Sequence, residues 1–330
     1  MTLLSVKNLS VEFPTTDGLV QAVNDVSFDI NAGETLAIVG ESGSGKTVTN
    51  LAIMGLIAKK TAHVSGKVLF ESAAGQVDLL SIDKEELRNY RGQDIAMIFQ
   101  DPMSSLHPFF TIGDQIIEAH QIHNKVDKKV SRNRAIELLE LVGIQGAASR
   151  INSFPHQFSG GMRQRAMIAM ALVNNPSLLI ADEPTTALDV TVQAQIIKLL
   201  QDLQQEFKMS MILITHDMGV VAGAANRVNV MYAGRIVESA GVNELYSNPR
   251  MPYTQGLLAS VPRMDRPHTA RLETIPGQPP SLISLPQGCS FSPRCSQKSN
   301  VSGNRCETEM PELTERAAEH SARCFIGENL

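Results

Sequence analysis

The chain has 330 residues, of which 43% are hydrophobic and 19% charged, and its formal net charge is −5. This length predicts two structural units, or one large unit with an extension. A mildly acidic chain gives no electrostatic reason to expect a nucleic-acid partner, so we predict none. The apolar runs fall short of the roughly 18–20 residues that span a bilayer, and the N-terminus lacks the pattern of a signal peptide. We therefore expect a cytoplasmic protein that reaches any membrane through a partner.

The N-terminal region alternates apolar and polar side chains, which predicts β-strands. The expected strands cover residues 3–6, 9–13 and 26–30, with turns at Gly18 and at residues 31–33. Such a start predicts an antiparallel β-layer added to the main sheet.

Residues 40–47 read GESGSGKT, the pattern G-x-x-x-x-G-K-[ST] of a phosphate-binding loop. The apolar run before them predicts a short buried strand, and the residues after them have helical spacing. Gly40, Gly43 and Gly45 allow the backbone to approach an anion without a Cβ in the way. Successive N–H groups then surround a phosphate at the positive end of a helix, so the sequence predicts binding of a nucleoside triphosphate.

Two side chains of this loop have expected roles of their own. Lys46 is expected to reach the β- and γ-phosphates, and the Thr47 hydroxyl to bind Mg²⁺. The predicted nucleotide contacts of the loop and the helix after it are Gly40, Ser42, Gly43, Ser44, Gly45, Lys46, Thr47 and Thr49.

The middle of the chain alternates helices and apolar strands. A helical stretch is expected at about residues 114–142, and strands at residues 178–181 and 211–215 enclose a helix at about residues 192–207. Strands that are apolar on both faces and alternate with helices predict a parallel sheet covered on both sides.

Two carboxylates follow the strand at residues 178–181. Asp182 is expected beside the phosphate loop, where it can hold Mg²⁺ directly or through water. Glu183 is the candidate general base, because a carboxylate there can orient the attacking water in line with the γ-phosphate and accept its proton.

The chain beyond residue 248 is rich in proline and has little regular periodicity, which predicts an irregular extension. The cysteines of the chain all lie there, with the spacing C-x5-C-x10-C-x17-C, which lacks the C-x2-C pairs of zinc ribbons. Four thiolates can hold a tetrahedral zinc ion or an iron–sulfur cluster, and buried cysteines without a common function are the alternative. The residues concerned are Cys289, Cys295, Cys306 and Cys324.

A third motif, FSGGMRQR at residues 158–165, completes an ordered set that resembles the ATP-binding cassette (ABC) ATPases over about residues 1–250. The resemblance implies a P-loop NTPase fold: a RecA-like parallel sheet core, an antiparallel β subdomain and a helical subdomain at about residues 100–175. Residues 251–330 would then form a C-terminal extension. The motifs in order are the phosphate loop, Gln100, Ser159-Gly160-Gly161, Asp182-Glu183, Ala187-Leu188-Asp189 and His216.

The family resemblance implies that two cassettes pack head to tail and share each ATP. Ser159, Gly160 and Gly161 would offer N–H groups to the γ-phosphate held by the opposite chain. Asp189 belongs to the D-loop and is included among the predicted nucleotide-binding residues.

The resemblance also assigns roles near the γ-phosphate and the adenine. His216 would contact the γ-phosphate, and Gln100 would sense Mg²⁺ or water. Phe13 would stack on the adenine, although it could equally be a core residue of its strand. The predicted catalytic residues are Lys46, Gln100, Glu183 and His216, and the predicted Mg²⁺ ligands are Thr47, Gln100 and Asp182.

Within the family the chain is most similar to the oligopeptide and dipeptide importer ATPases. The shared segments include FQDPMSSL at residues 99–106, ADEPTTALDVT at residues 181–191 and CSFSPRC at residues 289–295. The usual His-Pro-Tyr of the group reads Met-Pro-Tyr at residues 251–253. In this group the cysteine tail resembles one associated with a four-iron four-sulfur cluster, which we prefer over zinc.

The importer resemblance implies partners and a location. We expect a sister ATPase subunit, two transmembrane permease subunits and an extracytoplasmic peptide-binding protein, with this subunit peripheral on the cytoplasmic face of the inner membrane. The same motor could serve another cargo, such as nickel, a glycan or an antimicrobial peptide. A soluble ABC protein of translation or DNA repair is a weaker alternative, because the chain has no tandem cassette, coiled-coil insertion or nucleic-acid surface.

Overall fold

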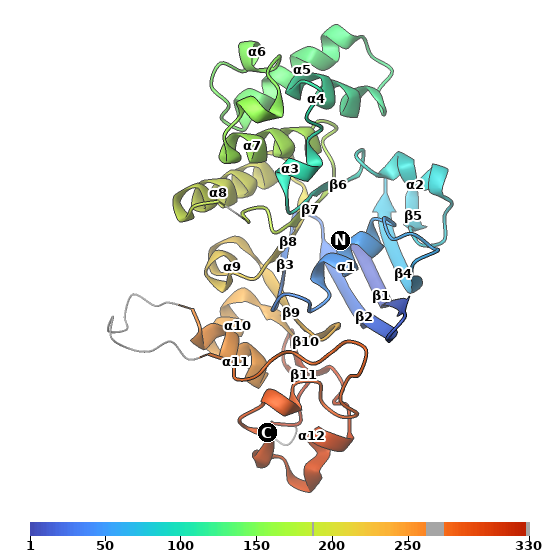
Figure 1. Ribbon diagram of the computed structural model, residues 1–330, viewed down its shortest axis with the longest axis vertical. Helices are drawn as coiled ribbons and strands as arrows, with labels where there is room; N and C mark the ends of the chain where they lie inside the picture. Colours follow the sequence, from blue (N-terminus) through green and yellow to red (C-terminus); the bar gives the residue numbers. More distant parts are fainter. Residues whose placement is uncertain (187, 262–273, 328–330) are drawn as a thin grey trace.

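The computed structural model describes residues 1–186, 188–261 and 274–327, so Ala187 of the predicted D-loop lies outside the described residues. Figure 1 shows a helical region at one end of the molecule, a sheet core in the middle with a second sheet beside it, and the C-terminal residues at the other end.

The second sheet is antiparallel, as predicted, and has the order β2-β1-β4-β5. Its first strand runs continuously through the two short strands expected from the sequence. Asn8 has a positive φ of 50°, and the pairing with β2 shifts register between Val6 and Leu9, so the strand bends there without ending. The strands are β1 (Thr2–Thr15), β2 (Gly18–Asn31), β4 (His63–Ser72) and β5 (Gly75–Asp78).

Within the described residues, the core sheet has eight strands in the order β11-β12-β10-β9-β3-β8-β7-β6. The strands from β9 to β6 pair in parallel, and every residue of β3, β7 and β8 is buried. This confirms the predicted parallel core. The strands are β3 (Thr35–Val39), β6 (Ile95–Ile98), β7 (Leu178–Asp182), β8 (Ser210–Thr215), β9 (Arg227–Tyr232), β10 (Arg235–Gly241), β11 (Thr314–Ala317) and β12 (His320–Ala322).

The helical stretch expected at residues 114–142 is divided into two helices, α4 and α5. Asn124 lies in the connection, where its Nδ2 donates to the His120 carbonyl at 3.0 Å and to Asn174 Oδ1 at 2.9 Å. These bonds hold the chain in a turn after α4. The helices of the region are α3 (Pro102–Ser105), α4 (Ile112–Gln121), α5 (Lys128–Leu141), α6 (Ala147–Arg150) and α7 (Gly160–Ala171), with the 3₁₀ turn η1 (Pro155–Gln157).

The remaining helices accompany the two sheets. They are α1 (Lys46–Ile53), α2 (Lys84–Tyr90), α8 (Val190–Phe207), α9 (Met218–Ala224), α10 (Val242–Ser247) and α11 (Pro252–Ala259). None of the helices in the described ranges is both long and apolar enough to cross a membrane.

The C-terminal part is largely irregular, as predicted, but its last strands differ from that expectation. Strands β11 and β12 extend the core sheet beside β10. The register is fixed by a buried contact, in which His320 Nε2 lies 2.7 Å from Glu238 Oε1 of β10. The short helical segments are η2 (Ser292–Arg294), η3 (Lys298–Asn300), η4 (Ser302–Asn304) and α12 (Arg305–Thr308).

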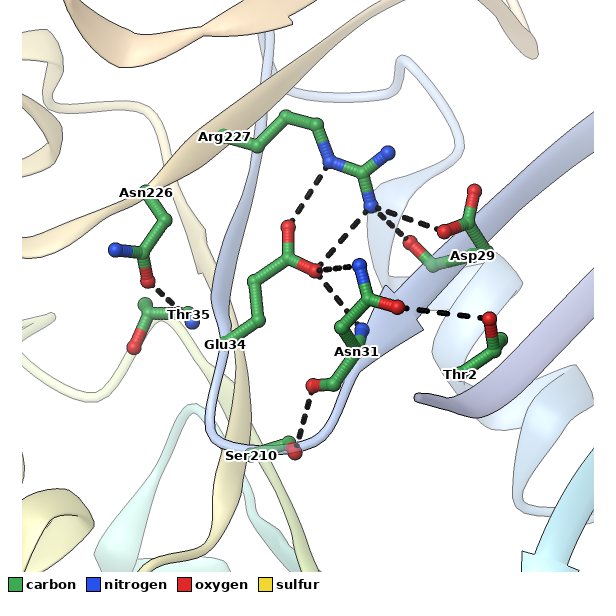
Figure 2. Close-up of polar contacts among 8 residues, drawn as sticks. All are labelled: Thr2, Asp29, Asn31, Glu34, Thr35, Ser210, Asn226 and Arg227. Atoms are coloured by element: carbon green, nitrogen blue, oxygen red, sulfur yellow. Dashed lines mark hydrogen bonds and ion pairs between the residues drawn. The ribbon is translucent and has the colours of Figure 1, made fainter.

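A polar network joins the two sheets at the beginning of β3 (Figure 2). Arg227 of β9 donates through Nε to Glu34 Oε1 at 2.9 Å, and the Thr35 N–H donates to Asn226 Oδ1 at 2.8 Å. Ser210 of β8 donates to the Asn31 carbonyl at 3.0 Å. These contacts anchor the turn between β2 and β3, at the opposite end of β3 from the phosphate loop.

Candidate functional site

The phosphate loop lies between β3 and α1, in the strand–turn–helix setting that the sequence predicts. Its glycines are required by close backbone contacts. A Cβ on Gly40, whose φ is +152°, would lie 2.2 Å from the Met231 carbonyl oxygen. A Cβ on Gly45, whose φ is +102°, would lie 2.4 Å from the Ala22 carbonyl oxygen. Only glycine lets the loop pack this closely against β9 and β2.

Lys46 is buried, and its ammonium group points back into the loop. Its Nζ donates to the Gly40 carbonyl at 2.7 Å and to the Glu41 carbonyl at 2.9 Å. Burial lowers the pKa of Lys46, while the carboxylates of Glu183, Asp182 and Glu41 act in the opposite direction. The side chain therefore lies inside the curve of the loop, where a bound phosphate would meet it.

Thr47 and Asp182 meet at the end of β7. The Thr47 hydroxyl donates to Asp182 Oδ1 at 3.2 Å. Burial raises the pKa of Asp182, and the hydrogen bond from Thr47 and the charge of Lys46 oppose this shift. A hydroxyl and a carboxylate oxygen side by side are hard oxygen ligands of the kind that Mg²⁺ prefers, so these residues fit the ion.

Glu183 follows Asp182 and is held by three side chains. Gln100 Nε2 and Thr186 Oγ1 donate to its Oε2 at 3.0 and 2.9 Å, and His216 Nδ1 lies 3.3 Å from its Oε1. Burial raises the pKa of Glu183, but the hydrogen bonds from Thr186 and His216 and the nearby charges outweigh it, so the pKa is lowered overall. The carboxylate is therefore ionised and oriented. The structure thus brings Gln100, Glu183 and His216 together.

The signature and D-loop residues lie elsewhere. Ser159 caps α7, since its Oγ accepts the Met162 N–H at 3.3 Å, and Gly160 and Gly161 open that helix. Asp189 caps α8 by accepting the Val192 N–H at 2.9 Å. Figure 1 places α7 in the helical region, away from the turn between β3 and α1. The structure therefore does not bring the start of α7 to the chain's own phosphate loop.

The four remaining side chains that the sequence predicts as nucleotide contacts lie in different surroundings. Ser44 is buried in the loop, with Oγ 3.5 Å from Lys46 Nζ, whereas Ser42 is exposed. Thr49 is fully buried and donates to the Gly45 carbonyl at 3.0 Å, so here it supports the loop from within α1. Phe13 is half-buried and packs against the core beneath the antiparallel sheet.

Sequence reasoning missed the residues that hold Glu41, the second residue of the loop. Arg294 forms two ion-pair contacts with its carboxylate, and the Tyr253 hydroxyl accepts its N–H. Both lie in segments quoted from the sequence, Met-Pro-Tyr at residues 251–253 and CSFSPRC at residues 289–295. Nothing in their local pattern points to a partner so far away in the chain.

The four cysteines are free thiols that lie in one region. The Cys289 N–H donates to the Cys306 carbonyl at 2.9 Å. Burial, with the neighbouring cysteines acting in the same direction, raises the pKa of Cys289 to about 11 and that of Cys324 to about 12. Within the described ranges, however, no three His, Cys, Asp or Glu side chains are grouped so that they could hold a metal ion. The predicted four-cysteine metal site, including Cys295, is therefore not formed in this structure.

Comparison with known proteins gives matches to both halves of the chain. A family model described as ABC transporter matches residues 23–186, and one described as oligopeptide/dipeptide transporter, C-terminal region, matches residues 237–301. The chain is 51% identical to a putative peptide import ATP-binding protein of Brucella melitensis, over 98% of this chain and 96% of that protein. It is 50% identical to the dipeptide transport ATP-binding protein of Bacillus subtilis, over 98% of this chain and 94% of that one.

Among solved structures, the fold is similar to a dimeric ATP-binding cassette in a post-hydrolysis state with bound ADP and phosphate. The TM-score is 0.64 at 27% identity, and the match covers 72% of this chain and 98% of that one.

Proposed function

This chain belongs to the ABC transporter family, in its group of oligopeptide and dipeptide transport ATP-binding proteins, and we propose that it hydrolyses ATP to power peptide import. One observation carries the ATPase part of the proposal. The phosphate loop, the Thr47–Asp182 pair and the oriented Glu183 carboxylate converge on one site. The peptide cargo is inferred from the relatives.

The loop would bind the phosphates through its N–H groups and Lys46. Thr47, Asp182 and Gln100 would hold Mg²⁺, which neutralises charge on the β- and γ-phosphates when bound. Glu183 would orient a water in line with the γ-phosphorus and take its proton as the new P–O bond forms. The bond to the β,γ-bridging oxygen then breaks, and ADP and phosphate leave. His216 would contact the γ-phosphate from beside Glu183.

A second cassette would complete each site. Ser159, Gly160 and Gly161 begin α7 on a surface distant from the chain's own loop, and a helix N-terminus suits a phosphate. Asp189 of the D-loop would lie at the same junction. The similar solved cassette is a dimer, which supports this arrangement. We propose a sister ATPase subunit as the second cassette.

The helical region offers a surface for a permease subunit. A cavity of about 450 Å³ between this region and the core sheet is lined by Leu56, Phe99, Ile122 and Met170 among others. Phe109 and Phe110, between α3 and α4 of the same helical region, are exposed. Such an apolar surface suits a segment of a membrane partner. We propose that two permeases hold the subunit at the cytoplasmic face of the membrane and that a peptide-binding protein delivers cargo from the other side.

The four cysteines are proposed to hold a four-iron four-sulfur cluster. A single zinc ion needs four sulfurs at about 2.3 Å from one point, whereas a four-iron cluster is held by thiolates spread around a larger group. The thiols of Cys289, Cys295 and Cys306 lie close enough to Cys324 to act on its pKa, and the resemblance of the cysteine tail to that of the importer group favours the cluster over zinc. Protein purified anaerobically should contain iron and sulfide in stoichiometric amounts. Zinc alone in the elemental analysis would overturn this assignment.

The test of the ATPase is the substitution Glu183→Gln. The amide keeps the shape of the side chain but cannot accept the proton, so ATP should still bind while hydrolysis falls by about 10²–10⁴-fold. The trapped ATP should also hold two cassettes together during gel filtration. Glu206→Gln, on the exposed face of α8, is the matched control and should hydrolyse ATP normally. Undiminished hydrolysis by Glu183→Gln would remove Glu183 from the role of base.

A further inference from the structure

We propose that Arg294 of the C-terminal extension is a positioning residue for the ATP site, because it holds the phosphate loop through Glu41. The inference rests on the proposed ATPase function and assigns part of that function to the extension. It makes the extension a structural support of nucleotide binding.

The contact between Arg294 and Glu41 is bidentate and largely buried. Nη1 of Arg294 lies 2.6 Å from Glu41 Oε2, and Nη2 lies 3.0 Å from Oε1. The Arg294 side chain is only 4% exposed and that of Glu41 29%. Paired, parallel contacts between a guanidinium and a carboxylate fix orientation as well as distance. The two residues are 253 positions apart in the sequence, so this contact ties the end of the chain to its first motif.

Glu41 is fixed on its backbone side as well. Its N–H donates to the Tyr253 hydroxyl of α11 at 2.9 Å. Its carbonyl accepts from Lys46 Nζ at 2.9 Å and from the Ser44 N–H at 3.2 Å. Glu41 therefore links the extension to the lysine that is expected to reach the phosphates. A loop that is held in shape before binding loses less conformational entropy when the ligand arrives.

Arg294 is itself held by the extension. Its Nε donates to the Pro276 carbonyl at 2.9 Å, and its Nη1 lies 3.3 Å from the Tyr232 hydroxyl. The rings of Tyr232, Tyr253 and Phe291 pack together beside it, with centroids 4.5–5.4 Å apart. Arg294 also directly precedes Cys295. Its position thus depends on how the cysteine-containing segment folds. A change in the fold of that segment would therefore alter the contact of Arg294 with the phosphate loop.

The experiment measures ATP affinity of the full chain by calorimetry, and KM and kcat for ATP of the full chain combined with its sister subunit. Arg294→Met keeps most of the side-chain stem but removes the charge. We expect the Kd and KM for ATP to rise by about tenfold, the value of one charge-assisted hydrogen bond, while kcat changes little. Arg294→Lys retains one contact with Glu41, so its Kd and KM for ATP should lie between those of Arg294→Met and the wild type. Lys298→Met removes an exposed cation from the same extension and should have no effect.

A double-mutant cycle tests whether Arg294 affects ATP binding through Glu41. If Arg294 acts through Glu41, Arg294→Met should have less than about a twofold effect on Kd in a Glu41→Gln background, because the bidentate ion pair is already lost there. An undiminished effect in that background would overturn the proposal, as would a lowered melting temperature with unchanged Kd and KM. Failure of the wild-type chain to hydrolyse ATP when it is combined with its sister subunit would instead contradict the proposed function.

Discussion

Glu183 combines a chemical role with an uncommon backbone conformation. Its φ is +45°, in the left-handed region, which residues other than glycine rarely adopt. The residue follows directly on β7, and its N–H donates to the Ile214 carbonyl of β8 at 3.0 Å. This strained turn directs the carboxylate toward Gln100 and His216. Strain of this kind is retained where the surrounding structure enforces it.

The strain can be measured by two substitutions that both remove the carboxylate. Neither Glu183→Ala nor Glu183→Gly should hydrolyse ATP, but glycine adopts a positive φ at no steric cost. Glu183→Gly should therefore exceed Glu183→Ala in free energy of unfolding by about 1 kcal/mol, measured by urea denaturation. The usual order, with alanine the more stable, would show that the conformation at this position is not enforced.

The connection between α4 and α5 shows what element-level patterns leave out. The sequence predicts one helical stretch at about residues 114–142, including the charge-dense residues 125–134. The break depends on Asn124 bonding to Asn174, a residue from after the signature helix. Local periodicity carries no information about such a partner. The phosphate loop was predictable for the opposite reason, because its strand, glycines and helix are consecutive.

Stability of the helical region should depend on pH through His120 of α4. Its Nδ1 lies 3.0 Å from the buried Ser131 hydroxyl of α5. His120 also lines a surface cavity together with Arg134 and Glu137 of α5. Burial lowers the pKa of His120, and the charge of Arg134 acts in the same direction. The unfolded chain then takes up the proton first, so stability is lost as the pH falls below about 6.5.

Thermal unfolding measured between about pH 7.5 and 5.5 tests this expectation. His120→Gln should lose less stability over that range than the wild type, because its side chain does not titrate. The matched control His63→Gln, on an exposed position of β4, should keep the pH dependence of the wild type. If His120→Gln followed the wild-type curve, another group would be responsible.

At the scale of the whole molecule, the chain assembles its site from distant segments. The parallel core and the antiparallel layer could be predicted because burial leaves a repeating pattern in each strand. The contact of Arg294 with Glu41 and the pairing of β12 with β10 could not, since each depends on a single side chain or a short strand meeting a remote partner. The predicted metal site of the four cysteines shows the same limit of sequence-based prediction, because the spacing of residues in the sequence does not determine their distances in the fold.

The junction between the two sheets gives a prediction for the whole fold. Arg227 of β9 is 26% exposed and contacts Glu34, which is 11% exposed, as well as Asp29 of β2 (Figure 2). Arg227→Met would leave the partly buried Glu34 carboxylate without this cationic partner, held by the hydrogen bonds from Asn31. We expect the free energy of unfolding to fall by about 1–3 kcal/mol, less than for a fully buried pair because water still reaches the arginine.

The location of this junction determines what else should change. It lies at the start of β3, whereas the phosphate loop follows the end of that strand, so the ATP affinity of the folded Arg227→Met protein should stay close to wild type. Lys198→Met removes an exposed ion pair within α8 and should cost less than about 0.5 kcal/mol. Equal losses for the two variants would show that the network does not hold the sheets together. A weakened ATP affinity in Arg227→Met would instead mean that the junction positions the loop through β3.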